Sequence, residues 1–270
     1  MMEVAPAEAF RSGRGEPILL LHGVMLNWQS WGAVLDDLAR DHEVLAPTLP
    51  GHWGGPDAPE HVTIAALTDH LCALLDRNNW ATAHLVGNSL GAWLSLELAA
   101  RGRARSVTAI APAGMWRPPS SAPTELIRRY RAYAPMLGVG SDGALASPML
   151  RSVVTPLLCH DPSRVPARLA MAVTAAFAHS EVLGDLLGND PAVAAGFDGL
   201  DDISVPVTVL RCEHDRVLPA RTITVPPDTA LLRTEILSGV GHVPMMEAPE
   251  LVAGHIRDNI AKAAAGQAPA

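Results

Sequence analysis

Residues 85–92 read Leu85-Val86-Gly87-Asn88-Ser89-Leu90-Gly91-Ala92, and this stretch decides the fold. It contains the pattern G-x-S-x-G and passes from an apolar, strand-like run at 83–86 into a helix-like run at 92–100. A serine on such a turn takes a strained backbone conformation that raises its hydroxyl above the sheet edge, beside the positive end of the helix. Glycine suits positions 87 and 91, because a side chain there would collide where strand and helix pass close together. The turn predicts a nucleophile at Ser89, and the alternative is an ordinary strand-turn-helix with a capping serine.

The composition bounds the fold class and the partners. The chain has 270 residues, 49% of them hydrophobic, which suits one sizeable α/β domain with an insertion, or two small domains. Its net charge of −8 is spread without long runs of one sign, which argues against nucleic acid or an anionic membrane as a partner. Three cysteines without metal-like spacing give no reason to expect a metal site or a disulfide framework, and we expect no cofactor.

The ends of the chain predict a soluble protein. The first residues lack a basic region followed by an apolar core, which is the pattern of a secretory signal. No later stretch reaches the ~18 apolar residues that a membrane-spanning helix needs. We therefore expect a cytoplasmic location.

Apolar runs and helical stripes alternate along most of the chain. The expected strands are 16–21, 44–46, 83–86, 106–111, 205–210 and 234–237, and the expected helices are 30–40, 64–77, 92–100 and about 249–261. Thr63 is the expected N-cap of the second helix. This alternation predicts parallel strands with right-handed crossovers and helices on both faces of the sheet.

The alternation stops between residues 114 and 200. Helical character appears there at 124–133, 144–159, 163–178 and 181–187, and Asp161-Pro162 is a natural helix start. We interpret residues 114–200 as a helical cap inserted over the sheet edge, and residues 1–113 with 201–270 as the core domain. The alternative is that these helices belong to the core itself.

A nucleophilic serine needs an imidazole that takes its proton and a carboxylate that holds the imidazole in the right tautomer. Parallel sheets collect function at the carboxyl ends of their strands. Asp215 and His242 each follow a predicted strand, and the order Ser89, Asp215, His242 is the one expected for this architecture. Glu213 is the alternative acid. His214 competes with His242, although it lies on the same loop as the carboxylate.

With these motifs the chain resembles α/β-hydrolase-fold enzymes along nearly its full length. The resemblance rests on four motifs in order, which are His22-Gly23, residues 87–91, residues 213–219 and residues 241–249. It implies a mostly parallel central sheet with a helical cap. It also implies that Ser89 is the nucleophile, that His242 is general base and then acid, and that Asp215 orients the imidazole. The backbone N–H groups of Val24 and Leu90 would form the oxyanion hole.

One loop departs from the family pattern. Residues 48–53 read T-L-P-G-H-W, where many relatives have D-x-P-G-x-G. That loop supports the site and carries no proton transfer. We therefore expect changed packing of the loop and intact catalysis.

The expected reaction is hydrolysis of a carboxylic ester, or a related acyl bond, of a small to medium apolar molecule through an acyl-enzyme. Trp28 and Trp116, each a few residues beyond a strand end, and Val243 beside the base are the expected substrate contacts. A small-molecule substrate is the expected partner. Thioesterase, lactonase, carbon–carbon hydrolase and acyltransferase activity would use the same site. A non-catalytic ligand-binding protein is a further alternative, against which the three intact residues argue.

Overall fold

The computed structural model describes residues 8–116, 124–125, 128, 148–180 and 182–266. These residues contain one seven-stranded sheet with the strand order β1-β3-β2-β4-β5-β6-β7. The strands are β1 (Ala9–Ser12), β2 (Pro17–Leu21), β3 (Glu43–Pro47), β4 (Ala83–Asn88), β5 (Ala104–Ile110), β6 (Val207–Cys212) and β7 (Leu232–Leu237). The pairs from β3 to β7 are all parallel, as the alternation predicts.

The exception is β1, which pairs antiparallel with β3 at one edge of the sheet. No strand was expected at Ala9–Ser12. The four residues read AFRS and are mostly exposed, so no apolar run or sustained alternation marks them as a strand. Pairing with the neighbouring strand, which local sequence does not encode, determines the conformation here.

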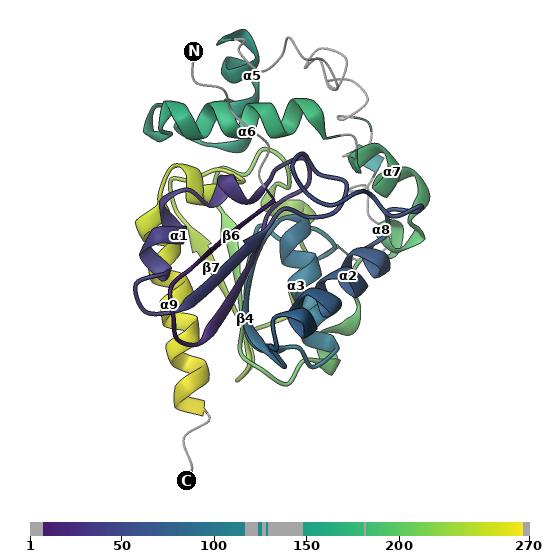
Figure 1. Cartoon of the computed structure of the whole chain (residues 1–270), viewed down its shortest axis with the longest axis vertical. Coiled ribbons are helices and arrows are strands. Elements are labelled where there is room, and N and C mark those ends of the chain that lie inside the picture. The colour runs from purple at the N-terminus through teal and green to yellow at the C-terminus, as the bar shows by residue number, and fades with distance from the viewer. Residues whose placement is uncertain (1–7, 117–123, 126–127, 129–147, 181, 267–270) are drawn as a thin grey trace.

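Helices cover both faces of the sheet. Figure 1 shows α2 (Ile64–Arg77) and α3 (Leu90–Ala100) on one face, and α1 (Ala33–Leu38) and α9 (Pro249–Gly266) on the other. Successive residues of a strand point to opposite faces, so each strand feeds two hydrophobic clusters. In β2, Leu19 and Leu21 join the cluster under α2 and α3, while Ile18 and Leu20 join the cluster under α1 and α9. Burial on both faces explains why this strand reads as an unbroken apolar run.

The second predicted helix begins and ends where the sequence indicates. The Thr63 hydroxyl accepts a hydrogen bond from the Ala66 N–H at 3.1 Å, so Thr63 is the N-cap of α2. Ile64, Leu67 and Leu71 form its buried stripe. The carboxylate of Asp190 accepts the Ile64 N–H at 2.6 Å and so binds this helix start to a distant segment of the chain.

Two expected helices are shorter in the structure. The expected helix 30–40 is divided into the 3-10 turn η1 (Trp28–Trp31) and α1, because Gly32 between them has φ +51°. The expected helix 163–178 is divided into the 3-10 turn η3 (Pro162–Arg164), which Asp161 caps, and α6 (Ala167–His179). The division follows from Pro166, because a residue before proline is pushed out of the helical region and Val165 is extended.

The remaining helices lie between β5 and β6 in the chain, and we call α5 to α8 the helical segment. Its members are α5 (Pro148–Leu158), α6, α7 (Val182–Asn189) and α8 (Pro191–Ala195). α8 was not expected, and most of the expected helix 124–133 and residues 144–147 lie outside the described residues. Figure 1 shows α5 and α6 lying across one end of the sheet. In the part of the chain that is described, no helix is both long and apolar enough to cross a bilayer.

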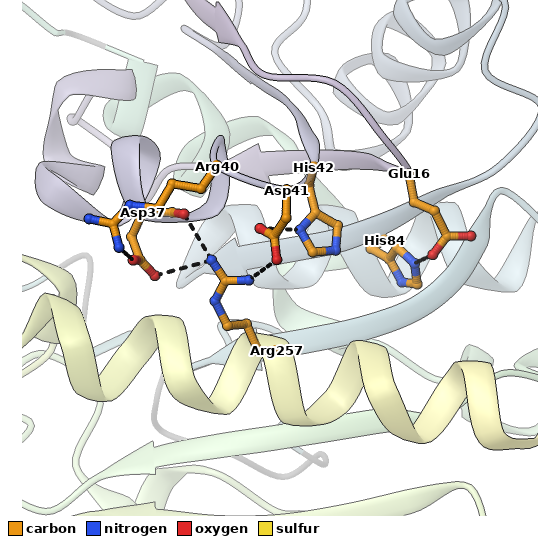
Figure 2. Close-up of polar contacts among 7 residues, drawn as sticks. All are labelled: Glu16, Asp37, Arg40, Asp41, His42, His84 and Arg257. Atoms are coloured by element: carbon orange, nitrogen blue, oxygen red, sulfur yellow. Dashed lines mark hydrogen bonds and ion pairs between the residues drawn. The ribbon is translucent and has the colours of Figure 1, made fainter.

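Polar contacts join α9 to the end of α1. The Arg257 guanidinium of α9 contacts the carboxylates of Asp37 and Asp41, and Asp37 also pairs with Arg40 at 3.0 Å (Figure 2). Figure 2 also shows the His84 ring beside the Glu16 carboxylate, at 3.3 Å. Since the side chains around Arg257 are partly exposed, each of their ion pairs contributes about 1 kcal/mol or less to stability, and the apolar cluster beneath them holds α1 and α9 together.

Candidate active site

The site lies where five parallel strands end side by side. The register aligns Leu21 of β2 with Gly87 of β4, and Asn88 of β4 with Ile110 of β5. Cys212 of β6 is paired with Leu237 of β7. The loops that leave these ends carry the residues singled out in the sequence. The topology therefore brings Ser89, Asp215 and His242 to one edge of the sheet.

Ser89 occupies the turn between β4 and α3 with φ +54° and ψ −113°. A non-glycine residue with positive φ is strained, and such strain is concentrated at functional sites. Both neighbouring glycines are required by packing. A Cβ at Gly87 would lie 2.1 Å from the carbonyl oxygen of Gly91, and a Cβ at Gly91 would lie 2.0 Å from that of Leu21. The predicted collision at these two positions is confirmed.

The Gly91→Ala variant should lose at least about 3 kcal/mol of unfolding free energy, because the new methyl group cannot be placed without moving α3 away from β2. Urea denaturation of the purified variant measures this loss. Gly254→Ala is the matched control, since it lies in α9 with open space around the added Cβ. That variant should gain up to about 1 kcal/mol from helix propensity. Equal stabilities of the two variants would contradict the close approach.

Asp215 and His242 form a hydrogen-bonded pair. The Nδ1 of His242 lies 2.7 Å from Oδ2 of Asp215, and the two residues are only 4% and 8% exposed. The other carboxylate oxygen of Asp215 accepts the N–H groups of Val217 and Leu218 at 2.8 and 2.7 Å. These bonds fix the carboxylate so that it accepts from Nδ1–H. In the neutral imidazole this arrangement leaves Nε2 as the atom that can accept a proton.

The alternative acid and imidazole on this loop face elsewhere. Glu213 is exposed, and its carboxylate accepts the Gly239 N–H at 2.8 Å. The His214 ring is also exposed and stacks on His160 with 3.7 Å between ring centroids. The carboxylate that contacts His242 is therefore the one on Asp215.

A side chain of the serine turn reaches the histidine loop. Asn88, which precedes Ser89, donates from Nδ2 to the backbone oxygen of His242 at 2.9 Å. The same amide donates weakly to the Ile110 oxygen at 3.4 Å. The Asn88 side chain is fully buried. It therefore joins the serine turn to the loop of the imidazole.

The residues proposed for the oxyanion hole flank Ser89. A Cβ on Gly23 would lie 3.4 Å from the Ser89 Cβ, so the loop after β2 passes directly over the serine, and Val24 is its next residue. Met25 in the same loop has φ +63°, a second strained position beside the site. Leu90 is the first residue of α3, and an N–H at that position has no partner within its own helix.

Two buried histidines support this loop. His22 belongs to a motif of the resemblance but had no role assigned to it, and His52 was not singled out as a site residue. The His22 Nδ1–H donates to the Gly23 oxygen at 2.8 Å, and its Nε2 accepts the Leu49 N–H at 2.9 Å. His52 meets the His22 ring edge-on, with centroids 4.9 Å apart, and its Nδ1 lies 3.1 Å from the Pro50 oxygen. Burial, and secondarily the neighbouring His52, holds the pKa of His22 well below its usual range.

Burial also lowers the pKa of His52 from 6.5 to about 4. The folded state therefore resists protonation of His52. The stability that comes from keeping this imidazole neutral is fully present above pH 6.5 and is lost as the pH falls toward 4. Between pH 7 and 5 the wild type should lose about 2 kcal/mol more unfolding free energy than His52→Asn. Urea denaturation at both pH values measures the difference. The exposed His61→Asn is the control, and a His52→Asn curve parallel to wild type would contradict the prediction.

The loop that departs from the family pattern lies against the helical segment. A Cβ on Gly51 would lie 3.4 Å from a methyl group of Val182. The Trp53 ring stacks on His179 at 5.5 Å, and the Trp53 N–H donates to the Ser180 hydroxyl at 3.3 Å. These contacts give the loop its own packing, against α6 and the start of α7.

The three predicted substrate contacts are engaged in packing. Trp28 is half-buried against Phe10 at 5.7 Å. The Trp116 indole N–H donates to the Val193 oxygen at 2.9 Å, and its ring meets Trp93 edge-on. Val243 is fully buried. Their roles in substrate binding stay predictions.

Comparison with known proteins identifies the family of the chain. Residues 18–255 match the profile of the alpha/beta hydrolase family. The epoxide hydrolase EphH of Mycobacterium tuberculosis is 39% identical over 204 residues, which are 72% of this chain and 95% of that protein.

Two solved structures share the fold at lower identity. An esterase from Thermogutta terrifontis is 22% identical with a TM-score of 0.69, over 94% of this chain and 93% of that chain. An enol-lactonase from Burkholderia xenovorans is 22% identical with a TM-score of 0.71, over 94% and 95%. By sequence and by fold, the chain belongs to the alpha/beta hydrolase family.

Proposed function

We propose that this protein is a serine hydrolase that cleaves carboxylic ester bonds of small to medium apolar molecules. The observation that carries the proposal is the 2.7 Å contact between buried Asp215 and His242, at the sheet edge where Ser89 occupies its strained turn. A hydroxyl nucleophile, an imidazole in the correct tautomer and an orienting carboxylate are the three groups that acyl transfer requires.

The chemistry of Ser89 separates this proposal from epoxide hydrolysis, the activity named for the M. tuberculosis relative. Attack of a serine oxygen on an epoxide carbon would form an alkyl ether, which has no carbonyl group for water to attack. Attack on an ester carbonyl forms an acyl-enzyme, whose carbonyl carbon water can attack in turn. A serine at position 89 therefore favours acyl substrates.

The proposed reaction has two steps. Ser89 Oγ attacks the carbonyl carbon while Nε2 of His242 takes its proton, and the N–H groups of Val24 and Leu90 stabilise the oxyanion. His242 then gives the proton to the leaving alkoxide as the acyl-enzyme forms. Water attacks the acyl-enzyme with the same imidazole as base, and the acid departs as Ser89 regains its proton.

The helical segment has a proposed role in choosing the substrate. We place it in a cap at residues 114–200, over the core formed by residues 1–113 and 201–270. Contacts of α6 support this placement, because the Leu169 side chain would lie 3.1 Å from a Cβ on Gly32 and the His179 ring stacks on Trp53. Trp28, Trp116 and Val243 are the proposed apolar contacts, and a small molecule is the proposed partner.

A substrate panel combined with active-site labelling tests the function. p-Nitrophenyl esters of increasing acyl length, acyl thioesters, lactones and styrene oxide are compared at equal concentration. A fluorophosphonate should label Ser89, and short p-nitrophenyl esters should be turned over fastest. Turnover of the epoxide without labelling of Ser89 would contradict the proposal, and folded protein that neither reacts nor turns over any substrate would indicate a binding protein.

A further inference from the structure

Glu247 is a buried carboxylate that the proposed reaction does not use. It is 3% exposed and follows the 3-10 turn η6 (Pro244–Met246), five residues after His242. Its Oε1 accepts the N–H groups of Gly241 and His160 at 2.6 and 3.0 Å, and its Oε2 accepts the Asp161 N–H at 2.7 Å. Three N–H groups around one carboxylate form a set of charge-assisted hydrogen bonds.

The three donors come from two parts of the chain. Gly241 directly precedes His242, whereas His160 and Asp161 follow α5 of the helical segment. The two backbones are in contact here, because a Cβ on Gly241 would lie 2.7 Å from the His160 nitrogen. One oxygen of Glu247 therefore bridges the histidine loop and the end of α5.

Neighbouring contacts place the end of α5 on both loops of the acid–base pair. The Val243 N–H donates to the Leu158 oxygen at 2.9 Å on the histidine side. On the acid side, the Arg216 guanidinium donates to the Pro156 oxygen at 2.7 Å, and the His160 and His214 rings are stacked.

The carboxylate of Glu247 lies close enough to the site to affect the pKa of two buried cysteine thiols, Cys212 and Cys159. Burial, and then the Asp215 and Glu247 carboxylates, raises the pKa of the Cys212 thiol well above its usual range. Burial and Glu247 also raise the pKa of the Cys159 thiol.

We propose that Glu247 is a positioning residue that fixes the backbone before His242 against the end of α5, and so couples the helical segment to the catalytic base. This inference rests on the proposed function, since it takes His242 as the base. The role depends on the length of the side chain, because Oε1 must lie within hydrogen-bond distance of both the Gly241 and the His160 N–H groups. A displacement of the imidazole by about 1 Å is enough to lower kcat about 100-fold.

Three substitutions separate the effect of the length of the Glu247 side chain from the effect of its charge. In Glu247→Gln the amide oxygen can occupy the Oε1 position and keep the Gly241 and His160 bonds. The NH₂ group then faces the Asp161 N–H and loses that bond, but the bridge to the residue before His242 remains, so kcat should stay within about 3-fold of wild type. Glu247→Asp keeps the charge but is shorter by one methylene, and kcat should fall about 10-fold. Glu247→Ala removes all three bonds, and kcat should fall about 100-fold with KM within about 3-fold.

The measurement is ester hydrolysis per folded molecule, with the rate of Ser89 labelling by a small fluorophosphonate as a second readout. Glu250→Ala, an exposed glutamate three residues further on, is the control and should match wild type. Three results would each overturn the proposal: unchanged kcat in Glu247→Ala, a rise in KM alone, or Glu247→Asp more active than Glu247→Gln. If Glu247→Ala does not fold, the order of the other two variants decides.

Ser89→Ala in the same assay keeps the two proposals separate. Full activity of Ser89→Ala would refute the serine mechanism itself. An inactive Ser89→Ala together with a fully active Glu247→Ala would refute only the positioning role.

Discussion

The Ser89→Ala variant is expected to lose ester hydrolysis by a factor of about 10⁴ to 10⁶ in kcat, because no other hydroxyl replaces the nucleophile on the turn between β4 and α3. The protein should stay folded, because alanine adds no atom to this crowded turn. The backbone bonds of Ser89, such as its N–H to the Ile110 oxygen at 2.9 Å, do not involve the hydroxyl.

Steady-state hydrolysis of a p-nitrophenyl ester, with fluorophosphonate labelling in parallel, measures this loss. Ser95→Ala is the matched control, since Ser95 lies in α3 and its hydroxyl donates to the Gly91 oxygen at 2.8 Å. The control should lose about 1 kcal/mol of stability and keep its activity. Labelling that persists in Ser89→Ala would show that another residue is the nucleophile.

Asp215→Asn is expected to lower kcat about 10⁴-fold by imposing the wrong tautomer on His242. The Val217 and Leu218 N–H groups both point at Oδ1, so the amide oxygen of asparagine must take that position. The amide NH₂ then faces Nδ1 of His242. Nδ1 must accept instead of donate, which places the imidazole proton on Nε2 and prevents it from taking the proton of Ser89.

Steady-state kcat for a p-nitrophenyl ester, measured alongside the free energy of unfolding, tests this reasoning. Stability should change little, because both backbone bonds to position 215 are retained. Glu213→Gln compares the two carboxylates of the loop and should keep kcat within about 3-fold of wild type, since Glu213 faces Gly239. Activity retained in Asp215→Asn and lost in Glu213→Gln would make Glu213 the acid.

Much of the core fold is encoded in local patterns. The strand β2 consists of a proline and four aliphatic residues, because both of its faces are buried. The N-cap of α2 and its buried apolar stripe can both be recognised in the sequence. The family and the parallel sheet could therefore be predicted. The edge strand β1 could not, because it depends on tertiary pairing. The breaks at Gly32 and Pro166 come from single residues that are visible in the sequence but stand inside otherwise helical stretches.

The site is encoded less completely. Chain order and strand ends were enough to bring Asp215 and His242 together as a prediction, and the structure places them 2.7 Å apart. The supporting residues have no such signal. Glu247 accepts hydrogen bonds from backbone groups more than 80 residues away, and the pKa of His52 is lowered by burial. Neither the distant contact nor the burial can be recognised from the local sequence. A polar residue amid apolar neighbours, as Glu247 is between Met246 and Ala248, was the available clue.

Asn88 has a consequence for how this protein can be changed in the laboratory. Its side-chain amide points at two carbonyl oxygens, so a carboxylate of the same shape would bring a negative charge against them. A leucine would remove the donor to the His242 oxygen, whereas the Ile110 oxygen would keep the Ser89 N–H. Directed evolution toward new substrates should therefore keep codon 88 constant and diversify the helical segment away from the end of α5, which itself contacts the histidine loop.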